Sequence, residues 1–136
     1  MDFFTAMEVS ASGLSVERTR MNVAASNLAN ASTTRAAGGG PYRRRDVVVQ
    51  SQPLPNAGAG INGVAVTSIQ PDTAPPRLEH DPGHPDADAQ GYVAYPNVNP
   101  VEEMVDMITA SRAYEAGVTA LTTSVSMAER ALGIGR

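Results

Sequence analysis

Apolar side chains recur at alternating intervals of three and four residues near both ends of this 136-residue chain. In the N-terminal stretch the spacing falls on Phe4, Met7, Ala11, Leu14, Arg18, Met21, Ala25 and Leu28, of which only Arg18 is not apolar. In the C-terminal stretch it falls on Met104, Met107, Ser111, Tyr114, Val118, Leu121, Val125, Ala128 and Leu132, of which only Ser111 is polar. A repeat averaging about 3.5 residues is typical of coiled-coil helices, because it keeps one seam facing a partner. The sequence therefore predicts two coiled-coil helices, over residues 1–31 and 99–136.

The C-terminal helix has a well-marked beginning. Asn99 is an N-cap candidate, Pro100 suits the first helical position, and Glu102 completes a capping-box arrangement. Glu103 is expected to interact with the positive end of the helix dipole and to lie off the apolar seam. Gly133 is the expected C′ residue. A helix of roughly 33 residues is about 50 Å long, so it must protrude from so small a domain or pair with another helix.

Residues 32–98 form a zone in which glycine and proline interrupt every helical pattern. Three short runs rich in β-branched residues lie between these breakers, at Tyr42–Gln50, Gly63–Ile69 and Tyr92–Tyr95. Each run suits a short strand. The chain is therefore predicted to be mainly α, with two long terminal helices that form a coiled-coil-like pair. Its central insert is expected to be either a small β-rich element or partly disordered.

The apolar composition indicates a weak core. Val, Leu, Ile and Phe together number 26 of 136 residues, whereas Ala alone contributes 21. That share is just under the one-fifth level at which core formation becomes difficult. The net charge of −4 does not favour full disorder. The chain is therefore expected to bury too little surface alone and to complete its core against partners.

Several kinds of site have no support in the sequence. The chain contains no Cys, which excludes disulfides and thiolate metal ligands. Its start has no basic region and no apolar run suited to a signal peptide, and no stretch approaches the ~20 apolar residues of a membrane span. It has neither a Gly-x-Ser-x-Gly elbow nor a phosphate-binding glycine loop with its Lys. We therefore predict no catalytic residue, no cofactor and no enzymatic activity.

The segment His80–Asp88 is the strongest candidate for metal chemistry. It holds two His and three Asp, which are ligand types for Zn²⁺ or another divalent ion. Its prolines and glycine exclude the helical His pairing of known zinc motifs. The alternative is a rigid turn in which Asp side chains accept hydrogen bonds from backbone N–H groups. We predict no metal ligands here and keep a metal-binding protein built on this segment as an alternative function.

The basic triplet Arg43–Arg45, preceded by Tyr42, is of a type that contacts phosphate groups. The chain as a whole is acidic, whereas nucleic-acid-binding domains usually carry a basic excess. Asp46 follows directly as a partial counter-charge. The triplet is therefore interpreted as protection of a strand edge or a subunit contact, and no nucleic acid partner is predicted.

The two heptad seams are compatible with more than one arrangement. The helices can form a hairpin within one chain, or their seams can also contact other chains, and periodicity alone does not distinguish the two. A generic coiled-coil adaptor is one function that suits either arrangement.

Stretches at both ends and in the centre of the chain resemble the flagellar basal-body rod proteins. The C-terminal signature reads GYVAYPNVNP and continues as VEEMVDMITASRAYEAGVTAL. The N-terminal ASNLANASTT is similar to the Asn-rich motif that follows the first helix of that family. The segments GGGPYRRRDVV and PPRLEHDPGHPDAD resemble one subfamily of the proximal rod. The resemblance covers nearly the whole chain.

This resemblance implies a structural subunit of the proximal rod that polymerises through its terminal helices and transmits torque for motility. Such subunits are exported by the flagellar type III apparatus without a cleaved signal peptide, and the rod crosses the periplasm without inserting into the membrane. The implied partners are further copies of the subunit, the rod proteins FlgB, FlgF and FlgG, and FliE with the membrane-ring base. The expected interface residues are Phe4, Met7, Leu14, Met21, Leu28, Met104, Met107, Tyr114, Val118, Leu121, Val125 and Leu132. The expected family-motif residues are Asn27, Asn30, Pro96, Asn97 and Asn99.

Two residues depart from the family pattern, because Ser32 and Gly117 stand where it has Asn. A Gly inside a helix costs about 0.5–1 kcal/mol relative to Ala. Gly117 is therefore expected to loosen the middle of the C-terminal helix while leaving both seams intact.

Overall fold

The computed structural model describes residues 2–55, 57–58 and 60–135, which form two long helices and two pairs of strands. Helix α1 spans Phe3–Ala29 and helix α2 spans Pro100–Ile134. The strands between them are β1 (Arg45–Pro53), β2 (Asn62–Pro71), β3 (Arg77–His80) and β4 (Tyr92–Tyr95). The prediction of a mainly α chain with a central strand-forming insert is confirmed at this level.

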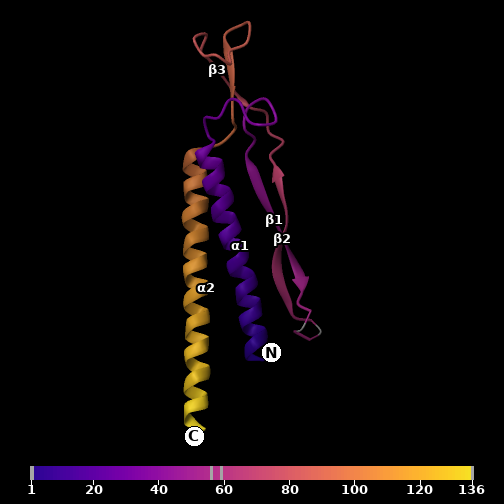
Figure 1. Cartoon of the computed structure of the whole chain (residues 1–136), viewed down its shortest axis with the longest axis vertical. Helices are drawn as coiled ribbons and strands as arrows, with labels where there is room; N and C mark the ends of the chain where they lie inside the picture. The colour runs from indigo at the N-terminus through magenta and orange to yellow at the C-terminus, as the bar shows by residue number, and fades with distance from the viewer. Residues whose placement is uncertain (1, 56, 59, 136) are drawn as a thin grey trace.

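The two helices lie side by side and run in opposite directions (Figure 1). The hairpin of β1 and β2 lies along α1 on the side away from α2 (Figure 1). The arm formed by β3 and β4 projects from the end of the helix pair that is opposite both chain termini. Because α2 has 35 residues and α1 has 27, the last turns of α2 extend past the beginning of α1.

Both helices begin at a polar cap. The Asp2 carboxylate accepts a hydrogen bond of 2.7 Å from the Thr5 N–H, and the Asn99 Oδ1 accepts one of 3.1 Å from the Val101 N–H. The predicted Asn99 N-cap with proline at the first helical position is therefore confirmed. Among the described residues, no hydrogen bond joins Glu102 to the Asn99 N–H, so the expected capping box is only half formed.

The helix ends differ in part from those expected. Helix α1 ends at Ala29, and the N–H of its C-cap Asn30 donates to the Ser26 carbonyl at 3.1 Å. The prediction that Gly133 follows the C-terminal helix was wrong, because α2 continues through Ile134 to a C-cap at Gly135. Gly133 is not among the positive-φ residues of the structure, so no left-handed conformation stops the helix there.

Strands β1 and β2 form an antiparallel hairpin that pairs Arg45 with Pro71 and Pro53 with Asn62, with an irregularity after Val48. Strand β3 pairs antiparallel with β4, from Arg77 opposite Tyr95 to His80 opposite Tyr92. The three predicted strand-forming runs correspond to β1, β2 and β4. Strand β3 was missed because all of its residues are exposed and only one is apolar, so it has no burial pattern to detect.

The hairpin is attached to α1 by a close approach at Gly63. The Ser12 Oγ accepts a hydrogen bond of 3.1 Å from the Val64 N–H. A Cβ at Gly63 would lie 2.9 Å from that same Oγ. A larger residue at this position would displace the Ser12 hydroxyl, so glycine suits the close approach of β2 to α1.

The core is thin, as the composition predicts. The buried apolar residues of the described part of the chain are Val16, Ala24, Tyr42, Ala57, Val93, Val98 and Ala110. Most of these are small, and they are spread over all parts of the molecule. Many larger apolar side chains stay exposed, most of them on α2. The isolated subunit therefore leaves much apolar surface in contact with water.

Candidate functional site: helix faces and a buried polar junction

The least exposed line of α2 repeats every seven residues. Glu103 and Ala110 are buried and Gly117 is half-buried on this line. A Cβ at Gly117 would lie 2.7 Å from the Leu14 Cδ2, so the missing side chain leaves room for this leucine of α1. Small residues thus let the helices approach closely. The seam predicted from the sequence coincides with this face at Met107, Tyr114 and Leu121 but is offset by one residue elsewhere, as Met104 is 45 % exposed beside the buried Glu103.

The structure divides the predicted interface residues into two groups. The half-buried ones are Met7, Leu14, Met21, Leu28, Met107, Tyr114, Leu121 and Val125. The exposed ones are Phe4, Met104, Val118 and Leu132. The first group is already partly covered within the chain, and the second group remains open to solvent. Their contact with other subunits stays a prediction.

A second apolar line lies on the opposite side of α2. It consists of Val101, Met104, Val105 and Ile108, which are 67 %, 45 %, 55 % and 52 % exposed. We call these four residues the outer apolar stripe. Because successive helical residues are turned by about 100°, the stripe is directed well away from the line that contains Glu103 and Ala110. The sequence-based prediction included only Met104 of this stripe.

Glu103 differs most from its sequence-based prediction, which was wrong. It was expected off the buried seam, yet it is only 1 % exposed. Its Oε1 accepts a hydrogen bond from the Arg44 Nε, and its Oε2 accepts one of 3.1 Å from the Asn27 Nδ2. The central segment brings Arg44 to both helices, so that the carboxylate is buried together with a counter-charge.

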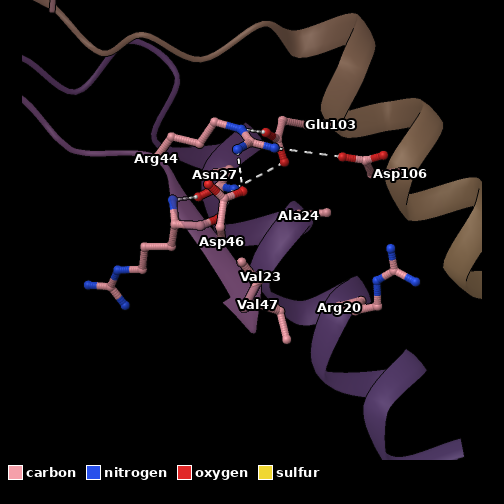
Figure 2. A pocket seen from close by; sticks show the side chains of 10 residues that line it. Arg20, Val23, Ala24, Asn27, Arg44, Asp46, Val47, Glu103 and Asp106 are labelled. Carbon is pink, nitrogen blue, oxygen red and sulfur yellow. Dashed lines mark hydrogen bonds and ion pairs between the residues drawn. The ribbon is translucent and has the colours of Figure 1, made fainter. Parts of the chain in front are cut away.

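Asn27 uses all of its amide hydrogen-bonding capacity at the same place (Figure 2). Its Nδ2 donates to the Glu103 Oε2 and, at 2.9 Å, to the Arg45 carbonyl. Its Oδ1 accepts hydrogen bonds of 2.9 Å from the Tyr42 hydroxyl and of 2.9 Å from the Arg45 N–H. We call Asn27, Tyr42, Arg44 and Glu103 the polar junction, since it joins α1, the segment leading into β1, and α2.

Arg44 is surrounded by carboxylates. Besides Glu103, its guanidinium pairs with Asp46 and lies 3.8 Å from the Asp106 Oδ2 (Figure 2). Burial by itself lowers the pKa of Arg44, but the hydrogen bond to Glu103 and the negative charges of Glu103 and Asp46 outweigh it and raise the pKa above its ordinary value. The Arg44 side chain therefore stays charged in the junction.

The junction borders a hollow of about 110 Å³ (Figure 2). Its lining comes from α1, α2 and the beginning of β1. Both carboxylate oxygens of Glu103 and all amide atoms of Asn27 are engaged within the chain. Such groups are suited to holding elements together, and their hydrogen bonds leave no free base for proton transfer.

The other family-motif residues lie near the junction end of the helices. Asn30 donates to the Ser26 carbonyl at 2.9 Å and accepts a hydrogen bond of 3.1 Å from the Thr33 hydroxyl. Pro96 is fully buried, Asn97 is exposed and Asn99 caps α2. The motif residues on which the resemblance rests are thus largely end-capping and connecting residues.

The segment His80–Asp88 folds as a turn between β3 and β4. The Asp81 Oδ1 accepts from the Gly83 N–H at 3.2 Å, and the Asp88 Oδ1 accepts from the Gln90 N–H at 2.8 Å. The His84 Nδ1 accepts from the Asp86 N–H at 3.0 Å. In the described part of the chain, no three His, Asp or Glu side chains are grouped as metal ligands. The metal-binding alternative is therefore not favoured.

The loop of this turn is attached to the segment after α1. Asp86 accepts a hydrogen bond of 2.8 Å from the Thr34 hydroxyl and also pairs with Arg35. The Thr34 hydrogen bond, together with the charge of Arg35, lowers the pKa of Asp86 below 3.8. The carboxylate thus remains ionised and keeps the arm near the end of the helix pair.

The basic triplet is divided among different contacts. Arg44 belongs to the polar junction, and the Arg45 guanidinium lies 5.8 Å from the centre of the Tyr42 ring. The expected counter-charge, Asp46, pairs with Arg44.

Neither of the two helices in the described part of the chain has the length and apolar character of a membrane-spanning segment.

Comparisons with known proteins match both ends and the full length of the chain. A family model described as "Flagella basal body rod protein" matches residues 7–36, and one described as "Flagellar basal body rod FlgEFG protein C-terminal" matches residues 89–134. The flagellar basal-body rod protein FlgC of Borreliella burgdorferi is 44% identical, over 98% of each chain. The proteins of the same name from Bacillus subtilis and Escherichia coli O157:H7 are each 43% identical, over all of both chains.

Proposed function

This chain belongs to the FlgC family of flagellar basal-body rod proteins, and from this membership we propose how its helices build the rod. Its function is that of a structural subunit of the basal-body rod, assembled with other rod components in the flagellar basal body. We propose that α1 and α2 pack together with coiled-coil geometry and that the outer apolar stripe of α2 contacts the helices of neighbouring subunits.

The outer apolar stripe is the observation that carries this proposal. Its four large apolar side chains are each 45–67 % exposed and occupy successive turns of α2. Water-exposed helix faces are usually polar, and contiguous exposed apolar patches mark interaction surfaces. The stripe and the covered line of α2 lie on opposite sides of one helix. Helix α2 can therefore pack on α1 and on a neighbouring subunit at the same time.

The identities of the neighbours belong to the proposal. We infer further copies of this subunit, the rod proteins FlgB, FlgF and FlgG, and FliE with the membrane-ring base. We also infer export in unfolded form by the flagellar type III apparatus without a cleaved signal peptide, and assembly in the periplasm into a rod that transmits torque. The support is the resemblance to the family over nearly the whole chain. A catalytic role has no support in the relatives, which are named as rod proteins.

The test is a charge placed on the outer apolar stripe. Ile108→Asp puts a carboxylate on a side chain position that is 52 % exposed in the subunit, so the fold itself is expected to tolerate it. In an assembled rod the same carboxylate would be buried without a partner, at a cost of several kcal/mol. We expect the variant to be made and exported, in non-motile cells that lack a complete rod.

The matched control is Ala113→Asp, at another exposed position of α2. Residue 113 is turned by more than a quarter of a turn from residue 108 around the helix axis, away from the stripe. We expect near-normal swimming and intact basal bodies from this variant. Motility plates and electron microscopy of basal bodies compare the two. Normal rods with Ile108→Asp would show that the outer apolar stripe is not an assembly face.

A further inference from the structure

The residues of α2 that face α1 repeat at an interval of seven, so periodicity alone does not define the relative position of the two helices. The covered line of α2 places Glu103, Ala110 and Gly117 seven residues apart. A shift of α2 by seven residues, about 10 Å along its axis, returns the same face of the helix toward α1. After a shift toward the arm, Ser124 would replace Gly117 opposite Leu14. A small residue would still face the leucine, although its Cβ would require the Leu14 side chain to move, as a Cβ at residue 117 would.

The length of α2 removes another barrier to this shift. Helix α2 has 35 residues against 27 in α1, and its excess lies beyond the first turn of α1 (Figure 1). Moving α2 toward the arm by two turns would bring this excess alongside α1. Exposed apolar residues such as Leu132, which is 75 % exposed, would then gain cover. Apolar burial therefore does not disfavour the shifted arrangement.

The polar junction does not repeat. In the shifted arrangement Ala110 would lie opposite Asn27, and Glu103 would move about 10 Å away from it. The Asn27 Nδ2 would lose its hydrogen bond of 3.1 Å, and Arg44 would lose the carboxylate that now accepts from its Nε. The polar junction therefore opposes the shift strongly, because unpaired buried polar and charged groups are costly. Pro96 and Val98, which are buried just before α2, would also be displaced.

The ion pair that holds the arm at this end of the molecule is weaker than the junction. Asp86 pairs with Arg35, whose side chain is 75 % exposed. Exposed ion pairs contribute little to stability and can exchange for water. By contrast, Glu103 and Asn27 are each 1 % exposed.

We propose that Asn27, Arg44 and Glu103 set the register of α2 on α1. Single buried polar residues are known to specify register in coiled coils at some cost in stability. Here they also determine the position of the outer apolar stripe along the subunit, since the stripe and Glu103 lie on the first turns of the same helix. The three are positioning residues, and the inference holds whether or not that stripe is an assembly face.

Cysteine cross-linking tests this directly, because the chain has no Cys of its own. The native register is reported by Leu14→Cys with Gly117→Cys, since a Cβ at residue 117 lies 2.7 Å from the Leu14 Cδ2. The shifted register is reported by Leu14→Cys with Ser124→Cys. The pair of Leu14→Cys with Ala120→Cys is the control, because residue 120 is exposed on α2. Cross-linking of this pair reports unfolding and not a defined register. A disulfide requires Cα atoms within about 7 Å, so the three pairs are distinguishable.

Each pair is placed in three forms of the full-length chain: the unaltered junction, Glu103→Gln, and a triple variant that combines Asn27→Leu, Arg44→Leu and Glu103→Leu. Oxidation is carried out where circular dichroism shows the full helix content of the unaltered chain. Intramolecular disulfides are read from non-reducing gels. We expect only the 117 pair to react with the unaltered junction. The triple variant should keep its helix content, and its pair with residue 124 should cross-link to a similar extent as its pair with residue 117. In the Glu103→Gln variant, cross-linking of the pair with residue 124 should be intermediate between that of the unaltered junction and that of the triple variant.

Two results would overturn the proposal. If the triple variant stays helical and still reacts only at residue 117, apolar packing sets the register without the junction. If both variants lose reaction at residue 117 with no gain at 124, the junction contributes stability alone. If the triple variant loses its helices, the Glu103→Gln variant alone is compared with the unaltered junction. The same two results would then overturn the proposal. If the pairs with residues 120 and 124 react equally in these variants, the cross-links arise from unfolding and not from a shifted register. This result would also contradict the proposal.

Discussion

The Glu103 carboxylate lies in one of the least exposed places of the molecule, where it pairs with Arg44. The stability of the fold is therefore expected to respond to the replacement of this single carboxylate by an amide. Substitution by Gln keeps the shape of the side chain and removes the charge that holds Arg44. A hydrogen bond to a charged group contributes about 1.5–3 kcal/mol. We expect Glu103→Gln to lower the free energy of unfolding by roughly 1–3 kcal/mol, as measured by urea denaturation.

The control for this prediction is the neighbouring Glu102→Gln. Glu102 is exposed in the same first turn of α2, and its charge interacts with the helix dipole alone. Its loss should cost about 0.3–1 kcal/mol at most. Equal midpoints for the two variants would mean that the burial of Glu103 contributes nothing to stability.

Asp88 provides a residue-scale prediction about pH. Backbone N–H groups of Tyr92 and Gln90 donate to its carboxylate and lower its pKa below 3.8. Its contribution to the stability of the turn is therefore complete above the unfolded pKa of about 3.9 and is lost as the pH falls through the lower folded value. Hydrogen exchange of the Tyr92 amide should accelerate in that window beyond the intrinsic pH effect.

The Asp88→Asn variant serves as the reference. Its amide oxygen accepts the same two hydrogen bonds at every pH, so the additional acceleration should disappear. An unchanged pH response in this variant would place the titrating group elsewhere, for example at Asp86 in the same loop.

At the scale of the elements, two helical glycines have opposite surroundings. A Cβ at Gly13 in α1 meets nothing within 4 Å, whereas one at Gly117 in α2 would lie 2.7 Å from the Leu14 Cδ2. Gly13→Ala should gain about 0.5–1 kcal/mol from helix propensity. Gly117→Leu should lose about 1–3 kcal/mol, because it overfills the space between the helices. Thermal melting followed by circular dichroism compares them, and a stabilised Gly117→Leu would contradict the close approach.

The terminal helices could be predicted from the sequence because their apolar spacing and the Asn99 cap are local signals. The line that α2 buries could not, since it contains Glu103, Ala110 and Gly117. None of these is a large apolar residue, so a search for apolar spacing selects their neighbours. Glu103 is buried only because Arg44, 59 residues earlier in the chain, reaches it. Asn27 inside a helix was the one local signal, since Asn has a low helix propensity and needs partners when buried.

The whole molecule buries few large apolar side chains. The described structure has helices of 27 and 35 residues, yet the buried apolar residues include only small or medium side chains on them. Helices in proteins gain most of their stability from tertiary packing, and isolated helices are marginally stable in water. We expect far-UV circular dichroism of the full-length chain at low micromolar concentration to show clearly less helix than these two lengths. Helix content should rise with protein concentration, and a fully helical, sharply melting monomer would contradict this.

The unequal lengths of α1 and α2 give the subunit two dissimilar extremities. One carries the β3–β4 arm above a capped junction, and the other carries a single unaccompanied helix with Ile134 85 % exposed (Figure 1). Contacts between unlike surfaces are head-to-tail and differ from the self-complementary contact of a two-fold dimer. If subunits of the proposed rod meet through these extremities, the two ends of the assembly would present different surfaces to the next component. The difference between the two helix lengths would then give the rod a polarity.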